Sequence, residues 1–212
     1  MDEKCAFMGS ERDMSEKGVS TPFTVTGTNT IIDMRRHIPM KTIEMPGANR
    51  SDTHHIIHPI PPFYDKGSKI LILGSFPSVK SREQMFFYGH PQNRFWKVMA
   101  QVFADEVPVT VPDKKAFLTK HHIALWDVIS SCDIKGSSDA SITNAVPNDL
   151  SRILGSANIR GIFVNGKTAE KYHKKFSENM IRRKAVCLPS TSPANAAWSI
   201  EKLVEAWSVV TK

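Results

Sequence analysis

The chain has 212 residues, of which 41% are hydrophobic and 23% charged, and its formal net charge is +7. These fractions are typical of globular proteins and exclude a wholly disordered chain or a collagen-like repeat. No apolar run approaches the roughly 18 residues that span a bilayer, and the first residues lack the basic-then-apolar layout of a signal peptide. We therefore expect an intracellular protein without a membrane segment, and its charge suggests a polyanionic partner.

The positive charge is concentrated in the later part of the chain. Residues 1–57 hold 7 Lys and Arg against 8 Asp and Glu, which leaves 21 basic and 13 acidic residues in residues 58–212. The first segment shows no amphipathic period, so we expect residues 1–57 to form a disordered or loosely attached extension. An arm packed on the domain is the alternative. Residues 58–212 are predicted to form one domain.

Apolar runs and amphipathic segments alternate along this domain. The run over residues 69–73, ended by Gly74, is typical of a strand buried on both faces. The elements predicted after it are a helix over 93–103, a helix over 113–121, a strand over 123–129, a polar loop over 130–144, a helix over 147–154, a strand over 159–164, a helix over 167–179, a strand over 185–188 and a helix over 196–209. This alternation indicates a parallel sheet in an α/β sandwich, whose ligands bind at the carboxyl ends of the strands.

Three segments near those strand ends have unusual sequences. Gly-Ser-Phe-Pro-Ser (74–78) follows the first strand, a long connection ends in Tyr-Gly-His-Pro-Gln-Asn-Arg-Phe-Trp (88–96), and Pro-Ser-Thr-Ser-Pro-Ala-Asn (189–195) follows the last strand. None matches the phosphate-binding signatures of nucleotide sites, and the sequence has no G-x-S-x-G elbow of a serine hydrolase. The few, scattered cysteines and the histidine spacing predict no metal site.

The order of these motifs resembles the uracil-DNA glycosylase superfamily, and most closely its hypoxanthine-DNA glycosylase branch. The likeness covers residues 58–212, and the joint presence of the first and last motifs makes it specific. It implies a three-layer α/β/α sandwich with a four-stranded parallel sheet. It also implies a monofunctional DNA glycosylase, without metal or organic cofactor, that hydrolyses the N-glycosidic bond of a deaminated base, with hypoxanthine the first candidate.

Other functions are compatible with the same residues. A glycosylase of this fold could instead remove uracil or mismatched thymine, or the scaffold could be a non-catalytic DNA-binding module. If the resemblance is fortuitous, a small-molecule α/β hydrolase is a further alternative. For a DNA glycosylase or a DNA-binding module the partner is DNA. We expect the protein to be a monomer.

Asn93 is the candidate catalytic residue, because the branch that the sequence resembles ties catalysis to the Asn before Phe-Trp. Its carbonyl can hold a water and its amide can donate a hydrogen bond. The alternative is an ordinary N-cap of the following helix. Other branches commonly carry an Asp or Asn that activates water just after the first Gly, where this chain has Ser75 and Phe76. Because this chain lacks that residue, Asn93 becomes the expected catalytic residue.

A base pocket and a DNA-contacting surface are predicted around Asn93. In the pocket, Phe76 is a stacking platform or a core aromatic, and His90 donates to the base or stabilises its loop. Asp127 accepts the N1 hydrogen of hypoxanthine, or it caps a helix or pairs with a Lys. The pocket comprises Gly74, Ser75, Phe76, Pro77, Tyr88, His90 and Asp127. The predicted DNA contacts are Ser78, Lys80, Arg82, Arg94, Lys97, Ser190, Thr191, Ser192, Pro193 and Asn195.

Overall fold

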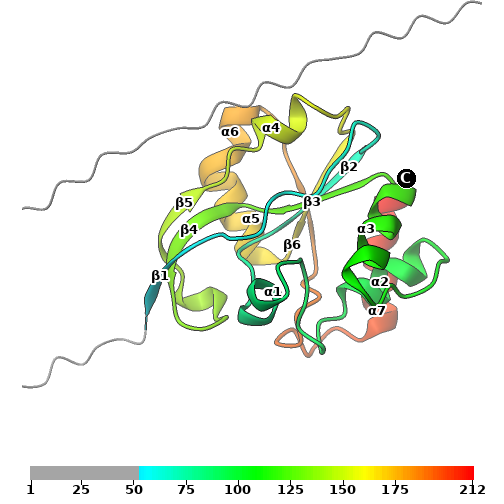
Figure 1. The fold of residues 1–212 in the computed structure, drawn as a ribbon, viewed down its shortest axis with the longest axis horizontal. Helices are drawn as coiled ribbons and strands as arrows, with labels where there is room; N and C mark the ends of the chain where they lie inside the picture. Colours follow the sequence, from blue (N-terminus) through cyan, green and yellow to red (C-terminus); the bar gives the residue numbers. More distant parts are fainter. Residues whose placement is uncertain (1–52) are drawn as a thin grey trace, which may run out of the picture. The chain divides into compact units, whose positions relative to one another are not determined.

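A four-stranded parallel sheet forms the centre of the computed structural model, which describes residues 53–212 (Figure 1). Its strands are β2 (Ile70–Gly74), β3 (Ile123–Asp127), β6 (Gly161–Asn165) and β7 (Val186–Leu188), in the spatial order β3-β2-β6-β7. The apolar runs of β2 and β3 are buried because helices cover both faces of the sheet. All four strands predicted from the sequence are present, with ends that differ by one or two residues.

Helices complete the two outer layers. Figure 1 shows α2 (Phe95–Val102), α3 (Val111–Lys120) and α7 (Ile200–Trp207) together on one side of the sheet, and α5 (Lys167–Tyr172) and α6 (Glu178–Ile181) on the other. The predicted three-layer α/β/α sandwich is therefore confirmed. In the part of the chain that the structure describes, no helix is long and apolar enough to cross a membrane.

Short helical segments differ from the prediction. The one-turn helix α1 (Val79–Glu83) lies where a loop was expected, and Ser78 caps it by accepting a hydrogen bond from the Ser81 amide. The helix predicted over residues 147–154 is reduced to α4 (Ser151–Leu154). The helix predicted over 167–179 is divided, because a wide π turn (His173–Ser177) separates α5 from α6.

A second, antiparallel sheet corrects two sequence predictions. It consists of β1 (His54–Ile57), β4 (Ile129–Ile134) and β5 (Thr143–Pro147), in the order β1-β4-β5. The polar loop predicted over 130–144 is wrong, because β4 occupies its first part. β4 buries Ile129, Cys132 and Ile134, and its polar residues Ser130, Ser131 and Asp133 make the segment resemble a loop in the sequence. β1 lies inside the predicted extension, so the folded part begins earlier than residue 58. The rest of that extension, residues 1–52, lies outside the described residues.

The register of the parallel sheet brings the functional segments together. Gly74 at the end of β2 pairs with Asp127 at the end of β3, and Asn165 at the end of β6 pairs with Leu188 at the end of β7. The carboxyl ends of all four strands therefore meet at one edge, where a doubly covered parallel sheet places its ligand site.

Candidate active site

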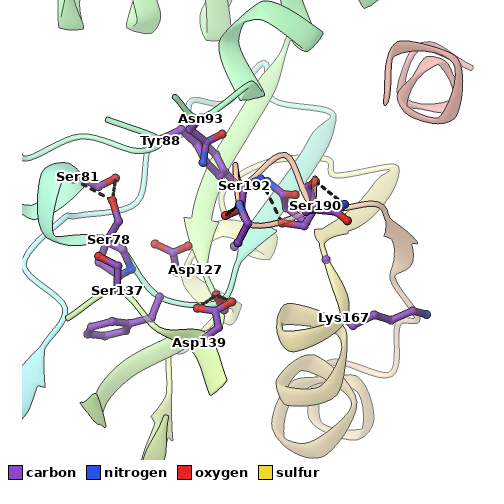
Figure 2. A pocket seen from close by; sticks show the side chains of 18 of the residues that line it. Ser78, Ser81, Tyr88, Asn93, Asp127, Ser137, Asp139, Lys167, Ser190 and Ser192 are labelled. Atoms are coloured by element: carbon purple, nitrogen blue, oxygen red, sulfur yellow. Dashed lines mark hydrogen bonds between the residues drawn. The ribbon is translucent and has the colours of Figure 1, made fainter. Parts of the chain in front are cut away.

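A cavity of about 850 Å³ opens at this edge of the sheet (Figure 2). Its wall is built by the segment after β2, the segment before α2, the ends of β3 and β6, the segment after β7, and the turn between β4 and β5. The volume lies within the range of about 300–1,000 Å³ that ligand sites span. In the view of Figure 2, Asn93 and Tyr88 lie on one side of the cavity, Asp139 lies on the opposite side, and Asp127 lies between them.

Asn93 presents its amide nitrogen, rather than its carbonyl oxygen, as the free polar group. Its Oδ1 accepts the Phe95 backbone N–H at 3.0 Å and the Thr191 hydroxyl at 3.0 Å. The Phe95 N–H is an obligate donor, so this contact fixes which side-chain atom is oxygen. Both lone pairs of the oxygen are then used, and the two N–H donors of Asn93 are left for a ligand in the cavity.

Asn165 supports this arrangement from the end of β6. Its amide donates to the Thr191 hydroxyl at 2.9 Å, and its carbonyl accepts the Thr191 N–H at 3.0 Å. Thr191 is fully buried, so it serves as a link between Asn165 and Asn93. Its predicted place near the DNA is therefore not observed.

Asp127 is held by His58, which was not among the predicted site residues. The Nε2 of His58 lies 2.8 Å from Asp127 Oδ2, and both side chains are buried. The His58 Nδ1 accepts the Ile60 backbone N–H at 3.2 Å, so Nε2 carries the proton and donates to the carboxylate. The His58 ring also packs edge-on against Phe76, with ring centroids 5.7 Å apart.

The other carboxylate oxygen of Asp127 explains the glycine at the end of β2. A Cβ built at Gly74 would lie 2.1 Å from Asp127 Oδ1, which no side chain tolerates without displacing the carboxylate. Tyr88 lies nearby, stacked on Phe95. Burial and the charge of Asp127 raise the pKa of the Tyr88 hydroxyl, so this group stays protonated and remains a donor at neutral pH.

Asp139 is a second carboxylate of the cavity, and the sequence did not indicate it. The Ser75 hydroxyl lies 3.0 and 2.9 Å from its two carboxylate oxygens. Although Asp139 is exposed by surface area, desolvation by the surrounding wall raises its pKa above the ordinary value, and the charge of Asp127 adds to this effect. The Ser75 hydrogen bond acts in the opposite direction.

Arg94, expected to contact phosphate, instead binds the segment after β7. Its guanidinium donates to the backbone carbonyls of Thr191, Ser192, Asn195 and Trp198. Four of its five N–H donors are used in this way. Arg94 therefore joins the start of α2 to residues 191–198, and its side chain is not available as a free cation.

The remaining predicted cations differ in their surroundings. Lys80 is exposed and pairs with Glu83 at 2.8 Å, and Lys97 is exposed on α2. Arg82 donates to the Pro77 carbonyl and lies over the Phe76 ring. All three lie outside the cavity wall. Lys80 and Lys97 remain predicted phosphate contacts, because surface lysines reach phosphate as point charges.

The structure brings most of the predicted site residues into one wall. Those that line the cavity are Gly74, Ser75, Phe76, Pro77, Ser78, Tyr88, Asn93, Asp127, Ser190, Ser192 and Asn195. Phe76 also belongs to the core, so both interpretations of it apply. His90 and the exposed Pro193 are absent from the lining. The Nδ1 of His90 accepts the Gln92 N–H, which favours the loop-stabilising interpretation.

Several lining residues were not predicted, among them Asp139, Asn165 and Trp198. A signal existed for Asn165, because it ends a buried strand beside Gly166, as Asp127 ends β3. None of the groups found so far forms a metal centre: within residues 53–212, no set of three or more His, Cys, Asp or Glu side chains is placed to hold a metal ion.

Comparison with known proteins identifies the family. The signature of the uracil DNA glycosylase superfamily matches residues 61–211. A protein of Methanosarcina acetivorans named hypoxanthine DNA glycosylase is 33% identical over 152 residues, which is 71% of this chain and 94% of that protein. A protein of the same name from Methanosarcina barkeri is 31% identical over 114 residues, covering 53% of this chain and 72% of its own length.

A solved structure agrees with these sequence matches. The solution NMR structure of a Methanosarcina acetivorans protein, described as a candidate uracil DNA glycosylase, superposes with a TM-score of 0.63. The two proteins are 30% identical, and the match covers 74% of this chain and 98% of the other. The family signature, over residues 61–211, contains the four-stranded sheet and the residues that line the cavity. This chain belongs to the uracil DNA glycosylase superfamily.

Proposed function

We propose that this protein is a DNA glycosylase that hydrolyses the N-glycosidic bond of a deaminated base, with hypoxanthine the first substrate. The observation that carries the proposal is the cavity at the carboxyl edge of the sheet, in which the amide of Asn93 and the carboxylate of Asp127 face the same space. The relatives named hypoxanthine DNA glycosylase support the choice of base.

Base recognition follows from the chemistry of Asp127. The target nucleotide must be rotated out of the duplex, which costs a few kcal/mol and is cheapest for a weakly paired base. Hypoxanthine carries a hydrogen on N1, and the Oδ1 of Asp127 can accept it. Adenine has an acceptor at N1 instead, and the lone pair of that nitrogen would be repelled by the carboxylate. The pocket therefore favours hypoxanthine over adenine. Phe76 offers an apolar surface to the flipped base from the same wall.

Asn93 and Tyr88 provide the donors that the reaction needs. As the bond to the sugar breaks, negative charge moves onto the departing base. Fixed donors aimed at that charge stabilise the transition state more than the ground state. The amide of Asn93 is held in place by Phe95 and Thr191, so it needs no reorganisation to donate.

The activity is tested with duplexes that contain one inosine, one uracil or only normal bases. The protein is incubated with each duplex, and abasic sites are then cleaved with alkali. We expect abasic product from the inosine duplex and none from the normal one. A larger yield from uracil would favour the alternative substrate. No product from any duplex, with salt-sensitive binding retained, would instead support a non-catalytic DNA-binding module.

A substitution at His58 tests the role of Asp127. His58→Phe keeps a ring against Phe76 but removes the donor to the carboxylate, and we expect it to slow hypoxanthine excision about tenfold. His58→Gln retains an amide donor at the position of Nε2 and should restore most of the rate. Single-turnover excision measures both variants. A Gln variant as slow as the Phe variant would show that His58 acts through packing alone.

A further inference from the structure

We infer that Asp139 is the general base that activates the hydrolytic water in the proposed glycosylase reaction. The inference rests on the proposed function and assigns a catalytic role to a residue outside the recognised motifs. Asp139 lies in the cavity wall, from the turn between β4 and β5, opposite Asn93 in the view of Figure 2. Its carboxylate is anchored by Ser75, the residue that follows Gly74.

Hydrolysis needs an acceptor for a proton of water, and the cavity offers few. The carbonyl oxygen of Asn93 already accepts two hydrogen bonds. The carbonyl oxygen of Asn165 accepts the Thr191 N–H. The remaining strong acceptors among the cavity-lining residues 74–198 are the carboxylates of Asp127 and Asp139. The water base must therefore be one of these two groups.

The surroundings of the two carboxylates assign different roles to them. Asp127 is buried, fixed by His58 and placed over the end of β2, where a rigid acceptor is suited to reading a base edge. Asp139 is reached by solvent, and the side-chain donors that act on its carboxylate are the hydroxyls of Ser75 and Thr168. A carboxylate has about four acceptor positions, so Asp139 retains room for a water.

The reaction balances without a further reactant. The water oxygen forms a bond to C1′ of the sugar as the bond from C1′ to the base breaks. The electron pair of that bond leaves with hypoxanthine, and the proton lost by the water moves to Asp139. Asp139 then releases this proton to solvent, and the departed base takes up one proton. Hypoxanthine and an abasic site are the products.

The charges around Asp139 favour its use as a base near neutral pH. Desolvation and the charge of Asp127 raise its pKa toward the working pH, where a general base is most effective. The other titratable groups that act on it are Cys132 and Tyr172. Burial raises the pKa of Cys132 to about 11 and raises that of Tyr172, so both groups are neutral at physiological pH.

Asp139→Asn is the direct test, measured as the single-turnover excision rate on an inosine duplex from about pH 5 to about pH 9. We expect a loss of about hundredfold, as for other general bases, and a rate that no longer falls at low pH. Binding to an undamaged duplex should be unchanged. Asp149→Asn is the matched control, because Asp149 lies outside the cavity wall and its carboxylate accepts the Ser151 N–H at the start of α4; it should retain full activity.

Two neighbouring substitutions should move the acid limb of the pH profile in opposite directions. The limb marks protonation of the base, so excision is lost as the pH falls through the pKa of Asp139. Asp127→Asn removes a negative charge that raises this pKa, so the limb should move to lower pH. Ser75→Ala removes a hydrogen bond that lowers it, so the limb should move to higher pH. A structural role of Asp139 would produce neither shift.

The outcomes separate this inference from the proposed function. Wild-type protein that releases no hypoxanthine would overturn the proposed function and the inference with it. An active wild type and an Asp139→Asn variant of equal rate would overturn the inference alone. A slow Asp139→Asn variant that keeps the wild-type acid limb would also overturn it, because another group would then be the base.

Discussion

Replacing Asn93 with Asp is expected to lower the rate of hypoxanthine excision about hundredfold, the loss typical of removing one transition-state donor. The aspartate keeps an oxygen that accepts the Phe95 N–H, so the start of α2 is preserved. It removes the two N–H donors, however, and adds a negative charge to a cavity that already holds Asp127 and Asp139. The measurement is single-turnover excision on an inosine duplex, with the melting temperature of each variant.

Asn93→Ala serves as the comparison, because it removes the hydrogen bond to the Phe95 N–H and the donors together. The N-cap of α2 is Arg94, not Asn93, so the N-cap interpretation of Asn93 is wrong, but its hydrogen bond still holds the first turn. Loss of one such hydrogen bond costs about 1 kcal/mol, which corresponds to a fall of roughly 2–4 °C in melting temperature for a chain of this size. We expect both variants to be slow and only the Ala variant to be less stable. If Asn93→Asp excised hypoxanthine at nearly the wild-type rate, Asn93 would only hold the start of α2 and would have no catalytic role.

The fold was predictable because its central sheet has a strong sequence signal. The apolar run of β2 and the similar run of β3 are buried on both faces. When helical segments separate such strands, a parallel sheet covered by helices on both faces is the arrangement that buries them. The antiparallel sheet was not predictable in this way. Strands β1 and β5 are largely exposed, and β4 carries polar residues between its buried ones. All three are defined by pairing between strands rather than by a local sequence pattern.

The site was predictable only where its residues end a strand or belong to a motif. Asp127 and Asn93 meet these conditions, and the structure places both in the cavity wall. His58 and Asp139 do not, because each gains its place through a contact with a residue 69 or 64 positions away in the chain. No periodicity marks such a partner in the sequence. The long-range hydrogen bonds from His58 to Asp127 and from Ser75 to Asp139 therefore determine the positions of both carboxylates in the cavity.

Replacing Arg94 with Ala is expected to lower the excision rate about hundredfold, since a small displacement of a catalytic group has effects of this size. Arg94 binds four backbone carbonyls of residues 191–198, and Thr191 in this segment orients Asn93. Without the guanidinium, the segment keeps the hydrogen bonds of Thr191 to the Arg94 backbone N–H and to Asn93, but it loses the four side-chain hydrogen bonds that hold residues 191–198. The lost charge-assisted hydrogen bonds should also cost about 2 kcal/mol of unfolding free energy, or roughly 4–8 °C in melting temperature.

Arg94→Lys distinguishes this attachment from a contact with DNA phosphate. Lysine keeps the charge but lacks the planar fork that reaches several carbonyls at once, so the Lys variant should be nearly as slow and as unstable as the Ala variant. The dependence of DNA affinity on salt should stay as in the wild type, whereas loss of one phosphate contact would reduce its slope by about one.

Lys97→Ala is the matched control: Lys97 is exposed on the same helix, and its loss should change DNA affinity without changing the melting temperature. If Arg94→Lys had wild-type activity and stability, Arg94 would act through its charge, as a contact with DNA phosphate. The position of the segment after β7 would then not depend on the Arg94 guanidinium.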